Sequence, residues 1–136
     1  MNKQTVAVLD FGSQYTQLIA RRIREKNVYS EILPHTISAD DIRKKNIPAV
    51  ILSGGPSSVY DNQAPQVDPR ILNLDIPVLG ICYGLHLMIN NSGGNILHKG
   101  QGEYGHAKIH SEGESLLLKD LSAESKVWMS HGHEID

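Results

Sequence analysis

The chain has 136 residues, a length that fits one domain with a core of its own. Hydrophobic residues make up 40%, charged residues make up 21%, and the net charge is −2. This balance, without any run of like charges, argues against a nucleic-acid partner or a membrane-surface protein. The apolar run Val6–Leu9 is too short for a signal peptide, and the single cysteine, Cys82, cannot form an internal disulfide. We therefore predict a cytoplasmic protein.

Three short apolar runs predict strands that are buried on both faces of a sheet, because none of them alternates with polar residues. They are Val6–Leu9, Ala49–Leu52 and Pro77–Ile81. A turn that contains glycine follows each run, and such turns suit the carboxyl ends of strands in an α/β fold.

Three helices are predicted between and after these strands. The first presents one apolar face, made of Tyr15, Leu18, Ile19 and Ile23. The second begins at an N-cap serine, Ser38, and runs through Lys45. The third begins just after Cys82 and ends near Gly93, since glycine favours helix C-termini.

Strand, turn and helix in this repeated order predict an α/β fold with a three-layer parallel sheet flanked by helices. Beyond residue 95 the pattern changes to shorter runs. We expect short antiparallel strands at an edge of the sheet, which would make that edge mixed. They are His106–His110, Leu116–Leu118 and Val127–Met129.

The segment Gly80–Gly84 carries the strongest chemical signal. Cys82 stands two residues from a glycine on either side, between a predicted strand and a predicted helix, which is the pattern of a nucleophile elbow. The turn requires small neighbours, and the start of the helix stabilises a thiolate. The alternative interpretation is that Cys82 is a small buried apolar residue.

A second glycine turn, Ser53–Ser58, follows the neighbouring predicted strand. Its main-chain N–H groups could form half of an oxyanion hole, because glycine allows a close approach to developing negative charge. The alternative is an ordinary β-turn around Pro56.

Four segments match a known family in the family's own order and span nearly the whole chain. They are Asp10–Glu25, Ile51–Pro56, Gly80–Gly84 and Trp128–Gly132. Together they resemble the class I, triad-type glutamine amidotransferase domain of the GMP synthetase family. This resemblance implies a flavodoxin-like α/β fold.

The resemblance also implies the roles of individual residues. Cys82 would attack the side-chain amide of L-glutamine, and the N–H groups of Gly55 and Tyr83 would hold the oxyanion. The residues implied to bind glutamine are Gly54, Gly55, His86, Ser130, His131 and Gly132. The last three are expected to form a loop that lines the pocket, largely through its main chain.

The chain departs from the family pattern at three places. His86 replaces a glutamine one turn after the nucleophile, where it either lines the pocket, the role we favour, or pairs with the thiol. His133 replaces an aspartate. The family's base and its orienting glutamate lie in a His-Pro-Glu segment, and that triplet does not occur in the 136 residues. We therefore expect residues 1–136 to be an incomplete amidotransferase domain with little glutaminase activity alone.

The resemblance implies a glutaminase that feeds ammonia to an ATP pyrophosphatase (synthetase) domain or subunit, which aminates XMP to GMP. We expect no cofactor for the glutaminase step, ATP and Mg²⁺ in the synthetase, which this chain does not include, and a homodimer of the whole protein. The alternative is a non-catalytic module that binds a synthetase partner or a small ligand.

Two further patterns carry no prediction of function. Gly100–Gly105 satisfies G-x-G-x-x-G but precedes a predicted strand rather than a helix, so we expect a loop. Histidines 106, 110, 131 and 133 lack the regular spacing of metal ligands, and we predict no metal site.

Overall fold

The computed structural model describes residues 4–94, 96–110, 116–117, 119 and 124–135. The chain divides into two compact units, one that ends at Ile96 and one that begins at Leu97. The first unit contains a sheet with its helices. The second contains most of the long strands β5 (Ile96–His110) and β6 (Glu124–Ile135).

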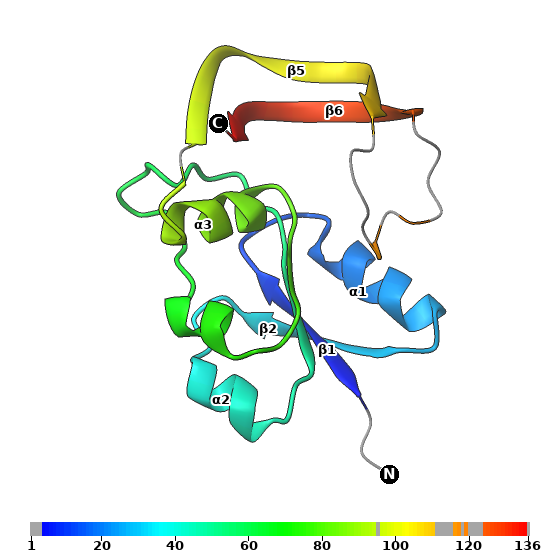
Figure 1. Ribbon diagram of the computed structural model, residues 1–136, viewed down its shortest axis with the longest axis vertical. Helices are drawn as coiled ribbons and strands as arrows, with labels where there is room; N and C mark the ends of the chain where they lie inside the picture. Colours follow the sequence, from blue (N-terminus) through cyan, green and yellow to red (C-terminus); the bar gives the residue numbers. More distant parts are fainter. Residues whose placement is uncertain (1–3, 95, 111–115, 118, 120–123, 136) are drawn as a thin grey trace. The chain divides into compact units, whose positions relative to one another are not determined.

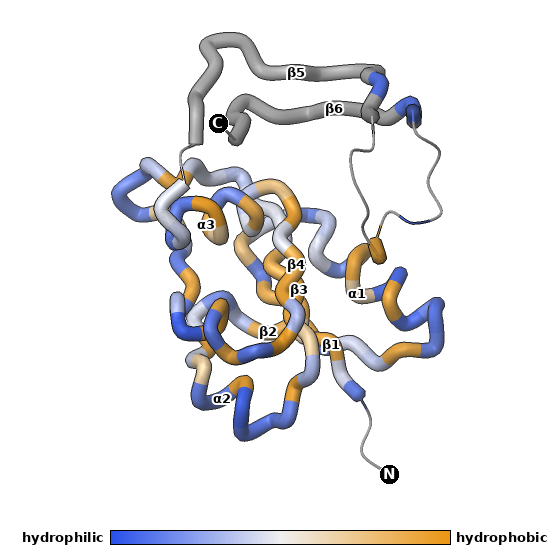
Figure 2. Tube along the Cα trace, viewed as in Figure 1, coloured by the Kyte–Doolittle hydropathy of each residue, from blue (hydrophilic) through white to orange (hydrophobic). Residues whose placement is uncertain are grey.

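The first unit is built on a parallel sheet with the strand order β2-β1-β3-β4. Figure 1 labels β1 and β2, and Figure 2 labels all four strands. Strands β1 (Thr5–Asp10), β3 (Ala49–Leu52) and β4 (Val78–Gly80) confirm the three predicted strands. In register, Val8 of β1 lies between Ile32 of β2 and Ile51 of β3. This order is that of flavodoxin-like folds, whose ligands bind beyond the carboxyl ends of the strands.

The edge strand β2 (Tyr29–Pro34) was not predicted. Ser30 and Leu33 are buried, whereas Tyr29 and Ile32 are exposed. This edge strand mixes polar and exposed residues with buried ones, so it lacks the unbroken apolar run that reveals a central strand. The strand is held to the sheet by its pairing with β1.

Helices cover both sides of the sheet, as expected for three layers. Figure 1 shows α1 (Thr16–Glu25) on one side and α2 (Ala39–Lys44) and α3 (Tyr83–Asn91) on the other. The short 3-10 helix η1 (Pro69–Asn73) belongs to the same core as α2 and α3. Main members of this core are Ala7, Leu9, Leu33, Ile42, Val50, Leu52, Ile71, Tyr83 and Leu87. The orange tubes of β1, β3 and β4 in Figure 2 trace its apolar centre.

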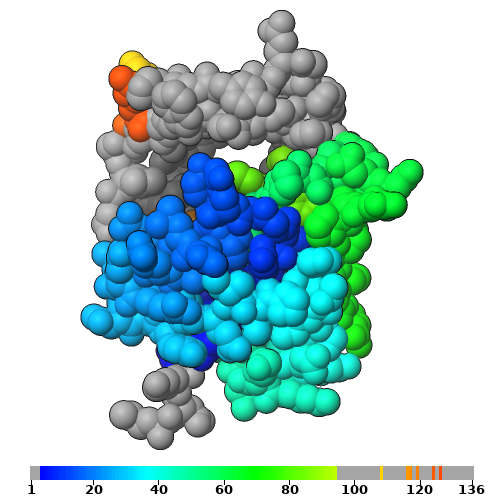
Figure 3. All heavy atoms as spheres, turned by 180° about the vertical axis from the view of Figure 1, so that it is seen from behind, coloured from blue at the N-terminus to red at the C-terminus, as the bar shows by residue number. Residues whose placement is uncertain are grey.

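The buried face of α1 differs from the predicted one. Thr16 and Ala20 are buried, whereas Tyr15 is 58% exposed and Leu18 is 41% exposed. Small side chains let the helix lie close to the sheet, and the buried hydroxyl of Ser30 donates to the Ala20 carbonyl at 2.7 Å. Tyr15 and Leu18 therefore lie on the outer surface, whereas the predicted face residues Ile19 and Ile23 are half-buried. The outer surface of α1 belongs to the blue region of Figure 3.

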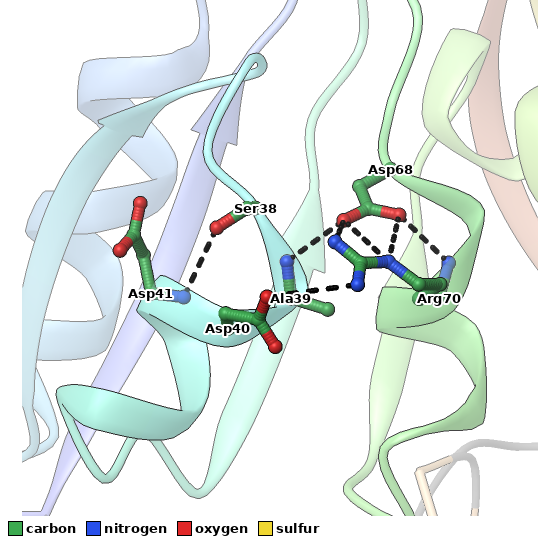
Figure 4. A network of polar contacts seen from close by, with 6 residues as sticks. All are labelled: Ser38, Ala39, Asp40, Asp41, Asp68 and Arg70. Atoms are coloured by element: carbon green, nitrogen blue, oxygen red, sulfur yellow. Dashed lines mark hydrogen bonds and ion pairs between the residues drawn. The ribbon is translucent and has the colours of Figure 1, made fainter.

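The N-terminus of α2 is capped by two side chains (Figure 4). The hydroxyl of Ser38 accepts the Asp41 N–H at 3.1 Å, which confirms the predicted N-cap, and the Asp68 carboxylate accepts the Ala39 N–H at 2.9 Å. Hydrogen bonds from the Arg70 guanidinium, and then from the Ala39 N–H, lower the pKa of Asp68 to about 2. Asp68 is thus charged at neutral pH and ties η1 to α2.

The second unit corrects the prediction for the C-terminal third. Strands β5 and β6 pair with each other in a separate two-stranded sheet, not at an edge of the parallel one. Segments His106–His110 and Val127–Met129 lie within them, as does Gly100–Gly105, which we expected to be a loop. Leu116 and Leu117 form an exposed turn instead of a strand, and residue 118 lies outside the described residues. Apolar clusters in the sequence predict strands that are too short here, because main-chain pairing continues through the glycines and polar residues of β5 and β6.

Candidate active site

Cys82 lies between the end of β4 and the first turn of α3, at the carboxyl edge of the sheet. Its side chain is exposed, and its backbone has φ 52° and ψ −116°. Residues other than glycine rarely adopt a positive φ, so this conformation stores strain of the kind found at functional sites. Cys82 occupies the N-cap position of α3 and its side chain makes no capping hydrogen bond. The predicted strand-to-helix turn is thereby confirmed.

Two glycines make this turn sterically possible. A Cβ on Gly80 would lie 2.6 Å from the Cα of Leu85, and a Cβ on Gly84 would lie 2.6 Å from the main-chain carbon of Leu52. Neither distance leaves room for a side chain. The Gly84 N–H also donates to the Ser53 carbonyl at 3.1 Å, which joins the turn to the end of β3.

The glycine loop after β3 lies directly beside the cysteine. A Cβ built on the buried Gly54 would be 3.4 Å from the Cβ of Cys82. Gly55 packs so closely on the Phe11 carbonyl that a side chain there would collide with it. A cavity of about 350 Å³ adjoins this loop, lined by Gly12, Ser13, Gln14, Tyr15, Gly55 and Pro56. The structure thus brings together the two turns that the sequence singled out separately.

Tyr83 anchors the turn from within. Its ring is buried, its edge meets Phe11 at 5.6 Å between centroids, and its hydroxyl donates to the Pro65 carbonyl. Burial, and then the negative charge of Asp61, raise the pKa of Tyr83, so its hydroxyl stays protonated at neutral pH. Its own N–H belongs to the first turn of α3, where N–H groups have no partner within the helix.

The remaining predicted residues fall into two groups. His86 lies one turn along α3, half-buried, and its N–H donates to the Cys82 carbonyl at 3.0 Å. Ser130, His131 and Gly132 lie in the second unit, within strand β6, where we had expected a loop. His133 lies in the same strand.

Beneath the glycine loop lies a pair of buried hydroxyls, Thr16 and Ser53, that sequence analysis did not find. Thr16 Oγ1 donates to Ser53 Oγ at 3.1 Å. These residues are 37 positions apart, and a lone threonine in a helix pattern carries no signal of such a pairing.

The part of the chain that the structure describes contains no group of three or more His, Cys, Asp or Glu side chains arranged to hold a metal ion. Within the same residues, every helix is too short or too polar to cross a membrane.

A family model described as glutamine amidotransferase class-I matches residues 7–136. The chain belongs to the class-I glutamine amidotransferase family. Among curated relatives of this amidotransferase, the GMP synthase [glutamine-hydrolyzing] of Bacillus licheniformis is 58% identical over 129 residues, covering 95% of the chain. The corresponding protein of Bacillus subtilis is 56% identical over 129 residues, again 95% of the chain. The amidotransferase chain spans about a quarter of the length of these relatives, 25% in both cases.

Solved structures support the same fold. A Thermoplasma acidophilum protein, assigned as one of the subunits of GMP synthase, superposes with a TM-score of 0.81 at 25% identity, over 99% of this amidotransferase and 68% of that chain. A glutamine amidotransferase from Thermotoga maritima gives a TM-score of 0.73 at 19% identity, over 100% of this chain and 64% of its own. The α/β architecture predicted from the sequence is confirmed.

Proposed function

We propose that this chain is the glutaminase part of a GMP synthase and that Cys82 is its nucleophile. The observation that carries the proposal is the exposed thiol of Cys82, held at a strained φ of 52° in the uncapped N-terminus of α3. The names of the relatives from Bacillus licheniformis and Bacillus subtilis, both glutamine-hydrolysing GMP synthases, support the choice of substrate.

In the proposed reaction, the thiolate sulfur of Cys82 forms a bond to the side-chain amide carbon of glutamine. The electron pair of the carbonyl moves onto oxygen, and the N–H groups of Gly55 and Tyr83 bind this oxyanion. Collapse of the intermediate breaks the carbon–nitrogen bond, and the nitrogen takes up a proton and leaves as ammonia. Water then cleaves the thioester, which releases glutamate and restores the thiol.

The field of α3 favours the first step. Cys82 stands at the positive end of this helix, and its side chain makes no hydrogen bond to the N–H groups of the first turn. The proton transfers require a base, which the family supplies from its His-Pro-Glu segment.

Glutamine would be held around this thiol by Gly54 and His86 from the first unit. His86 follows Cys82 by one helical turn, so the two residues share a face of α3. The residues Ser130, His131 and Gly132, which the family resemblance implies to bind glutamine through their main chain, belong to β6 in the second unit.

The ammonia would be used by a synthetase domain or subunit with ATP and Mg²⁺, which aminates XMP to GMP in the cytoplasm. The length of the relatives, about four times the region matched here, is consistent with such an additional part. The glutaminase step itself would need no cofactor.

Covalent labelling tests this proposal. A glutamine analogue with an electrophilic carbon in place of the side-chain amide should modify Cys82, detected by mass spectrometry of the peptide. L-Glutamine should protect the thiol, and D-glutamine should not. Labelling at equal rates with and without L-glutamine would contradict the proposed substrate, and it would favour the non-catalytic module.

A further inference from the structure

Ser53 joins three parts of the candidate site through hydrogen bonds. It is fully buried at the end of β3, where its N–H and its hydroxyl both donate to the Leu9 carbonyl, at 3.3 and 2.6 Å. Its own carbonyl accepts the Gly84 N–H of the elbow at 3.1 Å. The residue that follows it is Gly54, next to Cys82. A rotation at Ser53 would therefore move both the glycine loop and its link to the elbow.

The hydroxyl of Thr16 determines how Ser53 can be oriented. Thr16 is buried in the first turn of α1, and its Oγ1 lies 3.1 Å from Ser53 Oγ and 3.5 Å from Asp10 Oδ1. Since the Ser53 proton is directed at the Leu9 carbonyl, Ser53 Oγ is the acceptor for the Thr16 proton. Hydrogen bonds in such dry surroundings are strong, so removing the Thr16 hydroxyl takes this donor away from Ser53 Oγ.

Asp10 completes the arrangement at the end of β1. Its Oδ1 accepts the Gly12 N–H at 2.8 Å, which holds the loop after β1 in place. Phe11, within this loop, presents the carbonyl on which Gly55 packs. Gly55 is thus held in place by its packing on the Phe11 carbonyl and by Ser53, which precedes it at the end of β3.

We propose that Ser53 and Thr16 are positioning residues that set the distance between the glycine loop and Cys82, and thereby the strength of oxyanion binding. This inference rests on the proposed function of Cys82. Neither hydroxyl touches the reacting atoms in this account. Oxyanion donors must be placed to within a fraction of an ångström, so a small displacement of the loop lowers acyl transfer without removing the thiol.

The test compares two reactions of Cys82, the only cysteine of the chain. Acylation by p-nitrophenyl acetate passes through a tetrahedral oxyanion, breaks the ester carbon–oxygen bond and releases p-nitrophenolate. Alkylation by iodoacetamide displaces iodide and forms no oxyanion. Because both reactions use the same thiolate, the ratio of their rates cancels changes in thiol ionisation and reports oxyanion binding.

Thr16→Val keeps the shape of the side chain but removes the hydroxyl, and Ser53→Ala removes its partner. Each should lower the acylation-to-alkylation ratio by about tenfold. Thr16→Ser, which keeps the hydroxyl, should retain the ratio within about twofold. Ser38→Ala, which removes a serine hydroxyl from the α2 cap, is the matched control and should leave the ratio unchanged.

A folded Thr16→Val or Ser53→Ala chain with the wild-type ratio would overturn the inference, as would an equal fall in Ser38→Ala. Urea unfolding identifies which variants are folded. One folded variant, either Thr16→Val or Ser53→Ala, is sufficient for the test. If the ratio of the wild-type chain equals that of free cysteine, no oxyanion site exists, and the proposed function fails together with the inference. If the wild-type acylation-to-alkylation ratio exceeds that of free cysteine and neither substitution lowers it, only the inference about Ser53 and Thr16 is wrong, and the proposed function stands.

Discussion

The N-termini of α2 and α3 differ in how their first N–H groups are satisfied. At α2, Ser38 has an ordinary extended backbone with φ −84°, and its hydroxyl and the Asp68 carboxylate accept two of these N–H groups. At α3, Cys82 has φ 52° and provides no side-chain cap. The first end is built for stability, since a good cap contributes about 1 kcal/mol.

At the second end the Gly84 N–H donates to the Ser53 carbonyl, and it is the Tyr83 N–H that our proposal assigns to the developing oxyanion. Strain at Cys82 and the absence of a side-chain cap both lower stability, so the surrounding structure must hold the turn in place. Gly80 and Gly84 do this by allowing α3 to pack directly on Leu52 and on the end of β4. A helix N-terminus that is costly to form is therefore a better indicator of chemistry than one that is well capped.

The largest effect on this comparison should come from Gly84→Ala. The added Cβ would meet the main chain of Leu52, which cannot move without distorting β3, so we expect a loss of about 3 kcal/mol of unfolding free energy. Gly93→Ala is the control, since its Cβ meets nothing within 4 Å and only the φ of 86° opposes it. Urea unfolding of both variants should show a larger loss of unfolding free energy for Gly84→Ala than for Gly93→Ala. Equal losses would show that α3 does not depend on the close contact between Gly84 and Leu52.

Cys82→Gly should relieve the strain at the elbow. Glycine adopts a positive φ freely, whereas Cys82→Ala keeps the Cβ and therefore the strain. We expect the glycine variant to be more stable than the alanine variant by about 1 kcal/mol. The measurement is the difference in urea midpoint between the two, and an alanine variant of equal or greater stability would show that the turn is unstrained.

At the capped end of α2, Ser38→Ala should lower stability, in contrast to the gain expected when strain is relieved at Cys82. Removing the hydroxyl leaves the Asp41 N–H without its acceptor, at a cost of about 1 kcal/mol. Ser38→Asn should restore most of this loss, because asparagine caps as well as serine. Thermal unfolding of wild type, Ser38→Ala and Ser38→Asn measures these differences in stability. An alanine variant as stable as wild type would show that the Ser38 cap does not stabilise α2.

The smallest effect should be a change in pH dependence caused by Asp68→Asn. The pKa of Asp68 is lowered from 3.8 to about 2 in the fold, so its charged form stabilises the protein above pH 3.8. This contribution is lost as the pH falls from 3.8 towards 2. Wild type should therefore exceed the variant in stability near neutral pH, and the difference should shrink over that interval. Asp40→Asn, whose side chain is 61% exposed, is the control and should show little change.

How much the sequence predicts depends on whether a feature is local. Strands β1, β3 and β4 are recognisable because central strands of a parallel sheet are apolar on both faces, and the elbow is recognisable because its glycines stand at fixed distances from Cys82. By contrast, β2 is half-exposed, and its pairing with β1, a contact between different segments of the chain, determines its place. The face of α1 was mispredicted in part. The close contact with the sheet selects the small side chains of Thr16 and Ala20, while Ile19 and Ile23 of the predicted face are half-buried.

Contacts between residues that are far apart in the sequence could not be predicted from it. The pair Thr16 and Ser53 forms only after β1, β3 and α1 have assembled, and neither residue is unusual in its own segment. The neighbourhood of Gly54 and Cys82 was expected because parallel strands end at one edge, but its closeness was not. Topology thus predicted which loops meet, and packing decided how they meet.

The central claim is that the uncapped end of α3 presents the nucleophile of a glutaminase. It is tested most directly by Cys82→Ala in the whole enzyme, assayed for XMP amination with glutamine or with ammonium as the nitrogen source. The account predicts that glutamine-dependent amination disappears while ammonium-dependent amination remains at the wild-type rate. Glutamine-dependent amination that persists in this variant would contradict it.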